Sequence, residues 1–139
     1  MSELERNKQI AAKFFEHLSS GNVDALMALF DDAYTCWTAG SLPFSGTNPR
    51  AAVPAMVEGV TGVFPDGLEF TVHTMTAEDD RVSVEAGSRG EHVSGQTYSQ
   101  RYHYLFVIRD GRIVQAKEYF DTMHAADVLC SAPAPGFND

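Results

Sequence analysis

The sequence predicts an α+β domain in which helices cover one face of a curved antiparallel sheet. Apolar residues recur at three- and four-residue steps in the first half of the chain, as on one face of a helix. After Gly67 they alternate with polar residues, as along a strand. Short turn signals, of which Asp110-Gly111 is the clearest, separate the alternating segments. Helices followed by a meander of strands favour antiparallel pairing with the helices on one side.

Three helices are expected in the N-terminal half of the chain. The first carries a continuous apolar stripe, and Gly21 follows it as a typical helix terminator. The pair Asn48-Pro49 is typical of a helix start, and Pro54 is expected to kink or shorten the helix that it opens. The expected helices span about residues 4–18, 23–30 and 48–63, with a strand between the last two at about 34–39.

Four strands are expected in the C-terminal half. Glu78-Asp79-Asp80 and Asp110-Gly111 are predicted hairpin turns, whereas residues 91–96 form a looser connection. The expected strands span about residues 68–76, 81–89, 97–109 and 112–122. We therefore expect a single domain over residues 1–139, with its core at about 7–129 and a loose tail at 131–139.

The charge balance and the apolar pattern limit the partners and the compartment. The chain has 10 Lys and Arg against 19 Asp and Glu, a net charge of −9, so neither nucleic acid nor an anionic membrane is an expected partner. No apolar run approaches the roughly 20 residues that span a bilayer, and the first residues are charged rather than arranged as a secretory signal. The sequence therefore predicts a cytoplasmic protein.

No metal and no cofactor are expected. Cys36 and Cys130 are far apart and form no CxxC pair, and the five histidines form no HxH or HExxH motif. The chain also has no glycine-rich phosphate-binding loop. These absences favour chemistry carried out by side chains alone.

Six short phrases, spread in order along the chain, carry a family resemblance: Ser20–Asp24, Ala28–Asp32, Phe64–Asp66, Gly95–Tyr98, Arg109–Ile113 and Glu118–Thr122. Together they resemble SnoaL-like members of the nuclear transport factor 2-like superfamily over about residues 7–129. The resemblance implies a cone-shaped sheet wrapped by three N-terminal helices around an apolar pocket, with reactive groups on the strands. The superfamily includes ketosteroid isomerases, polyketide cyclases, epoxide hydrolases, dehydratases and proteins without catalysis, so fold alone assigns no reaction.

Asp121 is the leading catalytic candidate. A carboxylate at the end of an apolar and aromatic strand is open to partial desolvation, which raises a carboxyl pKa towards acid/base work. The resemblance implies the same role, because SnoaL cyclases and limonene epoxide hydrolases use the aspartate of this phrase in proton transfer. The alternative is that Asp121 or Thr122 caps a short helix through about residues 123–129.

His103 and Tyr119 are the expected partners of Asp121. They occupy odd positions of the last two strands, and we expect these odd positions to face the pocket. The resemblance places His103 where ketosteroid isomerases carry the acid that binds the developing oxyanion, although a core or interface histidine is at least as strong an alternative. The Tyr119 hydroxyl is expected to orient a substrate oxygen. The expected substrate-binding residues are Trp37, Phe14, Thr35, Lys117 and Leu105.

Departures from the family pattern narrow the reaction. Glu85, Gly87 and Ala39 stand where the epoxide hydrolases hold their arginine, second aspartate and asparagine. Thr38 occupies the position of the catalytic base of ketosteroid isomerases, and Phe14 occupies the position of their oxyanion-binding tyrosine. The sequence therefore disfavours both constellations and leaves a SnoaL-like arrangement in which one aspartate manages proton transfer.

The resulting expectation is an acid/base enzyme, an isomerase, cyclase or dehydratase, acting on a small apolar carbonyl or polyketide- or steroid-like compound. The alternative is a non-catalytic ligand-binding or dimerisation module of the same fold. We also expect a homodimer through the open face of the sheet. The even positions Tyr102, Tyr104, Phe106 and Ile108 are assigned to that face, because such an apolar surface is too costly to leave in water.

Overall fold

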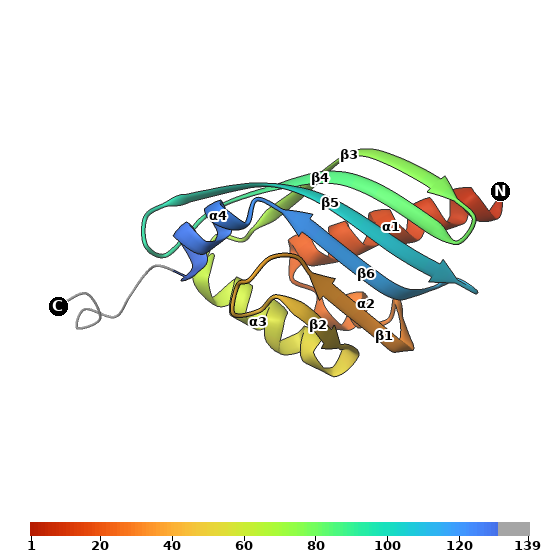
Figure 1. Cartoon of the computed structure of the whole chain (residues 1–139), viewed down its shortest axis with the longest axis horizontal. Coiled ribbons are helices and arrows are strands. Elements are labelled where there is room, and N and C mark those ends of the chain that lie inside the picture. The colour runs from red at the N-terminus through yellow and green to blue at the C-terminus, as the bar shows by residue number, and fades with distance from the viewer. Residues whose placement is uncertain (131–139) are drawn as a thin grey trace.

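A computed structural model of the protein describes residues 1–130 as a six-stranded sheet with helices against one face (Figure 1). The strand order is β2-β1-β6-β5-β4-β3. The elements are α1 (Glu3–Ser20), α2 (Val23–Met27), β1 (Phe30–Thr38), β2 (Gly46–Pro49), α3 (Val53–Val63), β3 (Glu69–Glu78), β4 (Arg81–Glu91), β5 (Thr97–Arg109), β6 (Arg112–Phe120) and α4 (Thr122–Ala125). The predicted α+β class is confirmed, and the predicted loose tail lies outside the described residues.

Local signals fix both ends of α1. The Ser2 hydroxyl accepts a hydrogen bond from the Glu5 amide at 3.1 Å, and Gly21 ends the helix in the left-handed region at φ 67°. The buried face of α1 carries Phe14 and Phe15, which pack on the sheet. The apolar stripe read from the sequence therefore places α1 across the sheet, as Figure 1 shows.

The segment from Met27 to Val63 differs from the prediction in two places. The second helix ends before Phe30, because Phe30 begins β1 and its ring stacks on Tyr34 with the centroids 3.8 Å apart. Asn48 does not cap a helix but lies in the short edge strand β2, paired with Cys36. The third helix therefore starts later, after a 3-10 turn at Arg50–Ala52. Pro54 falls in its first turn, where proline is tolerated.

The four long strands lie close to their predicted ranges, and the two turns are those expected. Asp79 and Asp110 adopt positive φ angles of 53° and 51°, as tight hairpins require. One strand pair was not anticipated, because β1 runs parallel to β6. Three irregularities interrupt the ladders. β1 shifts register against β6 between Phe30 and Thr35, β3 shifts against β4 between Val72 and Thr74, and β6 shifts against β5 next to Ile108.

The two faces of β5 are the reverse of the assignment made from the sequence. Tyr102, Tyr104, Phe106 and Ile108 are all buried on the concave face, on which α1 packs, and the odd positions point outward. The ring centroid of Phe14 in α1 lies 5.0 Å from that of Phe106, and the ring centroid of Phe15 lies 5.0 Å from that of Tyr104. The prediction that these four side chains form an open dimerisation face is therefore wrong. The most continuous apolar face of a strand belongs against the helices, since only there is it removed from water.

Candidate active site

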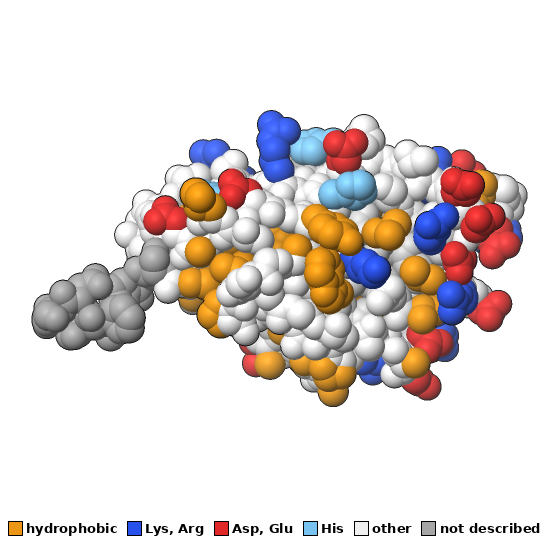
Figure 2. All heavy atoms as spheres, viewed as in Figure 1, with side chains coloured by type: hydrophobic (Ala, Val, Ile, Leu, Met, Phe, Trp, Pro, Cys, Tyr) orange, Lys and Arg blue, Asp and Glu red, His pale blue; other side chains and the backbone are white. Residues whose placement is uncertain are grey.

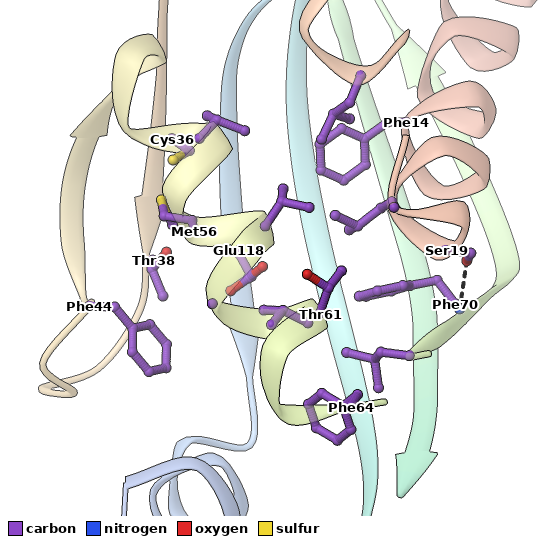
Figure 3. A pocket seen from close by; sticks show the side chains of 18 of the residues that line it. Phe14, Ser19, Cys36, Thr38, Phe44, Met56, Thr61, Phe64, Phe70 and Glu118 are labelled. Carbon is purple, nitrogen blue, oxygen red and sulfur yellow. Dashed lines mark hydrogen bonds between the residues drawn. The ribbon is translucent and has the colours of Figure 1, made fainter. Parts of the chain in front are cut away.

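A cavity of about 550 Å³ lies between the concave sheet face, the end of α1 and α3. Figure 3 shows Phe14 and Phe70 on one side of it, Phe44 and Thr38 on the other, and Glu118 pointing from β6 into the space that α3 covers. The Phe70 amide donates to the Ser19 hydroxyl at 2.8 Å, which ties the end of α1 to the start of β3. The cavity is of the size that small-molecule sites occupy and is lined mainly by apolar side chains.

Glu118 is the carboxyl group of this cavity. It projects from β6, opposite Tyr104 of β5, and its neighbour in β1 is Thr38. Burial raises the pKa of the Glu118 carboxyl above its ordinary value, while the hydroxyl of Tyr104, which donates a short hydrogen bond to Oε2, partly opposes this shift. A carboxyl that is desolvated, oriented by one donor and open to a cavity is suited to exchanging protons with a bound molecule.

Tyrosine hydroxyls form the polar part of the wall next to Glu118. Tyr102 shares a hydrogen bond of 2.7 Å with Ser88, and Tyr98 accepts one of 3.0 Å from the Gln100 amide. Burial raises the pKa of Tyr34, Tyr98, Tyr102 and Tyr104, so all four phenols stay neutral at physiological pH. The cavity therefore offers neutral hydroxyls around one titratable carboxyl.

Cys36 and Tyr34 complete the site from β1. Both line the cavity and hydrogen-bond to one another, and burial together with the nearby Glu118 charge raises the pKa of the Cys36 thiol. A raised thiol pKa keeps Cys36 in its weakly nucleophilic SH form. Its contribution to the site is therefore shape and weak hydrogen bonding.

Asp121 lies at the end of β6, outside the cavity. Its carboxylate accepts a hydrogen bond of 3.1 Å from the amide of His124 and caps α4. Its main chain is held by the Gln100 side chain, which bonds both the amide and the carbonyl of Asp121, at 3.0 and 2.9 Å. The structure thus brings Asp121 into the capping geometry that was its alternative interpretation.

His103 and Tyr119 lie together, but on the open face of the sheet. They are directly opposed on β5 and β6, their rings 6.5 Å apart, and His103 also hydrogen-bonds to Ser83. Tyr119 is 43% exposed and packs against Trp37 at 5.2 Å. The expectation that these residues face the pocket is wrong, because the odd positions of β5, and those of β6 that follow the register shift, point away from the helices.

Among the predicted substrate-binding residues, Phe14 alone lines the cavity. The other four occupy outward positions on β1, β5 and β6 and are half-buried by their neighbours on the open face: Trp37, Thr35, Lys117 and Leu105. Their placement in the pocket is wrong for the same reason as that of His103. The cavity exceeds the volume of about 300 Å³ that small-ligand sites need, but the carboxyl that lines it belongs to Glu118 and not to Asp121.

Glu118 was missed because the odd positions of both β5 and β6 were expected to face the pocket, and a bulge in β6 conceals which of its residues face the helices. An undistorted two-residue hairpin at Asp110-Gly111 pairs Tyr104 with Lys117 and turns Glu118 outward. The register shift in β6 moves the partner of Tyr104 to Glu118 instead. The one available signal was the apolar even face of β5, which marks the concave side; the bulge itself left no clear mark in the sequence.

Within residues 1–130, no three His, Cys, Asp or Glu side chains are grouped so as to hold a metal ion. No helix in the same range is long and apolar enough to cross a membrane. The absence of a metal and of a cofactor stays a prediction from the sequence.

Comparisons with known proteins agree with this architecture. Residues 11–116 match the family model of the SnoaL-like domain. No curated protein matches the sequence. Among solved structures, PrhC from Penicillium brasilianum NBRC 6234 superposes with a TM-score of 0.83 at 17% identity over 91% of this chain and 87% of its own. An NTF2-like protein from Burkholderia xenovorans LB400 superposes with a TM-score of 0.74 at 22% identity, over 91% of this chain and 97% of that protein. TerC, co-crystallised with polyporic acid, superposes with a TM-score of 0.78 at 16% identity, over 88% of this chain and 97% of TerC.

Proposed function

Because the chain belongs to the SnoaL-like family, we propose that it is an acid/base enzyme in which Glu118 transfers protons to and from a small apolar carbonyl compound. The observation that carries this proposal is the position of the Glu118 carboxyl, which projects into a cavity of about 550 Å³ with its pKa raised by burial. Glu118 takes the role that the sequence analysis gave to Asp121. The reaction class, isomerase, cyclase or dehydratase, is otherwise unchanged.

The chemistry follows from what the cavity wall offers. The Glu118 carboxylate removes a proton from a carbon next to a carbonyl group, and the electron pair moves onto the carbonyl oxygen to form an enolate. The neutral hydroxyl of Thr38, whose residue is paired with Glu118 in the sheet, is suited to donate to that oxygen. The protonated carboxyl then returns the proton to another carbon, or to a departing hydroxyl.

Tyr104 is a positioning residue in this scheme. Its hydroxyl donates to one oxygen of Glu118, which fixes the plane of the carboxyl and leaves the other oxygen for the substrate. The ring of Tyr104 is itself held between Phe15 and Phe106. Packing of this kind keeps a reactive group in one orientation, as proton transfer requires.

The wall of the cavity favours a neutral, largely apolar substrate. An anionic molecule would meet the Glu118 charge in a poorly solvated space, which costs free energy. Aromatic side chains such as Phe64 and Phe70 offer flat surfaces for rings instead. TerC, a protein of the same fold, was crystallised with polyporic acid, which supports a small organic ligand at the level of the fold.

Hydrogen–deuterium exchange at carbon tests the proposal before the natural substrate is known. A panel of small cyclic enones and aromatic ketones, such as 2-tetralone, is incubated with the protein in D₂O, and mass spectrometry follows deuterium uptake next to the carbonyl group. We expect accelerated uptake for some members, and a loss of about 10²-fold or more in Glu118→Gln. His103→Gln is the matched control, since His103 lies on the opposite face of the sheet.

Full exchange activity in Glu118→Gln would remove this residue from the mechanism. The second candidate function, a non-catalytic ligand-binding module, is favoured by the mainly apolar lining of the cavity. It predicts that panel members bind equally to the wild-type protein and to Glu118→Gln, and that neither accelerates exchange. Ligand-induced thermal stabilisation measures that binding, so the two functions give opposite pairs of results.

A further inference from the structure

A second hollow lies on the open face of the sheet, on the side away from the helices. Gly87 of β4 forms its floor, with Thr71 of β3 and Arg101 of β5 opposed to it in the sheet register. Arg89 and Ser99 stand one pleat further along. Figure 2 shows basic and histidine side chains, with an acidic side chain among them, over β3 to β5 on this face. We call this hollow the Gly87 groove.

Two local features of the backbone build the Gly87 groove. The register shift in β3 falls at His73, which has no direct partner on β4. A bulge of this kind redirects the side chain of its extra residue, and here the imidazole lies over β4. Gly87 makes room for it, since a Cβ at this position would lie 3.1 Å from His73 Nε2 and 3.2 Å from the carbonyl oxygen of Gln100. A larger residue at position 87 would therefore crowd out either the imidazole or the space beside it.

The cationic groups of the groove are available for a ligand. Within residues 1–130, the ion pairs are Lys8–Glu5 and Arg109–Asp80, so neither Arg89 nor Arg101 is paired with a described carboxylate. Both side chains are exposed, as is that of His73. The carboxylate in the groove is that of Glu69. Glu69 lies opposite Arg89 in the sheet register but forms no ion pair with it.

We propose that the Gly87 groove binds a small, doubly charged tetrahedral oxyanion such as a phosphate group. Two guanidinium groups, an imidazole and the hydroxyls of Thr71 and Ser99 surround the glycine floor, and donors from three strands suit the several oxygens of a tetrahedral anion. A planar carboxylate would use a single arginine fork. The net charge of −9 repels long polyanions, which restricts the ligand to a small group.

Titration with inorganic phosphate tests this site in the full chain. Backbone amide shifts are followed by NMR at constant ionic strength, with chloride replaced by phosphate. We expect saturable shifts at Thr71, Gly87 and Arg101, and weaker shifts with acetate. Arg101→Gln should weaken binding by about fivefold or more, because it removes a charge-assisted donor.

Two further variants separate a built site from a general ion atmosphere. Arg81→Gln removes the same charge from the other end of β4 and should leave the affinity for phosphate unchanged. Glu69→Gln removes the opposing carboxylate and should strengthen binding by about twofold or more. Shifts that never saturate, equal responses to acetate, or equal losses in Arg81→Gln and Arg101→Gln would each overturn the proposal. None of these readouts depends on Glu118, which lies on the other face.

Discussion

The two faces of the sheet differ in how well they solvate a polar side chain, and so in how strongly such a side chain indicates a functional site. On the open face, His103, Lys117 and Tyr119 touch solvent, where a charge costs almost nothing. On the concave face, Glu118 stands among aromatic side chains, and its pKa is raised because the charged form is poorly solvated. A chemically capable residue is therefore weak support for a site on the first face and strong support on the second.

The largest expected contrast concerns stability and uses two neighbouring residues of β5. Phe106 is fully buried under α1, so Phe106→Ala should lower the free energy of unfolding by about 3–5 kcal/mol through lost burial and a cavity. Leu105 points to the open face and is half-buried, so Leu105→Ala should cost less than about 1.5 kcal/mol. Urea denaturation of both variants measures the difference, and equal losses would contradict the assignment of the two faces.

The raised pKa of Glu118 predicts a pH-dependent contribution to stability. A carboxyl whose pKa is raised on folding stabilises the protein below its ordinary value of 4.5, and this contribution is lost as the pH rises through the folded-state pKa. Glu118→Gln should therefore gain stability relative to the wild-type protein as the pH increases from about 4.5. Denaturation at several pH values measures this difference.

Asp80 provides a control of opposite sign. The hydrogen bond from Arg109 lowers the pKa of the Asp80 carboxyl, so its contribution is present above the ordinary pKa and is lost as the pH falls. Asp80→Asn should therefore differ from the wild-type protein mainly at higher pH, and less in acid. A Glu118→Gln difference that is flat over the same pH range would mean that the Glu118 carboxyl is fully solvated.

Assembly is the next contrast, because the even face of β5 is buried and a homodimer would have to form through other residues of the open face. Trp37, Tyr119 and Leu105 lie on β1, β6 and β5 of the open face, where Figure 2 shows hydrophobic side chains over β6 and β1. If two copies pair there, Trp37→Ala should raise the dimer dissociation constant by about tenfold or more, since buried tryptophans often dominate interfaces. Sedimentation velocity measures this, and a wild-type monomer at micromolar concentration would reject the dimer.

The sequence predicted the strands far better than it predicted which side of each strand faces the pocket. Period-two alternation and Asp110-Gly111 located β5 and β6, because these signals are local. The facing of Glu118 depends on a bulge in β6, and that of His73 on one in β3, and both arise from register between strands. The helix start predicted at Asn48 was wrong for a related reason. The local sequence favours a helix start, but pairing with Cys36 of β1 places Asn48 in an edge strand.

The smallest expected effect concerns Asp121, whose cap geometry predicts stability changes without a role in proton transfer. Asp121→Asn retains an acceptor for the His124 amide and should change the free energy of unfolding by only a few tenths of a kcal/mol. Asp121→Ala removes the acceptor and should cost about 1 kcal/mol. Both variants should keep the deuterium-exchange activity of the wild-type protein within about twofold, because the cavity wall and Glu118 are untouched. If Asp121→Asn instead lost activity while Glu118→Gln retained it, the proton-transfer role would return to Asp121. The contrast between the two faces would then fail at the residue where the sequence first placed the chemistry.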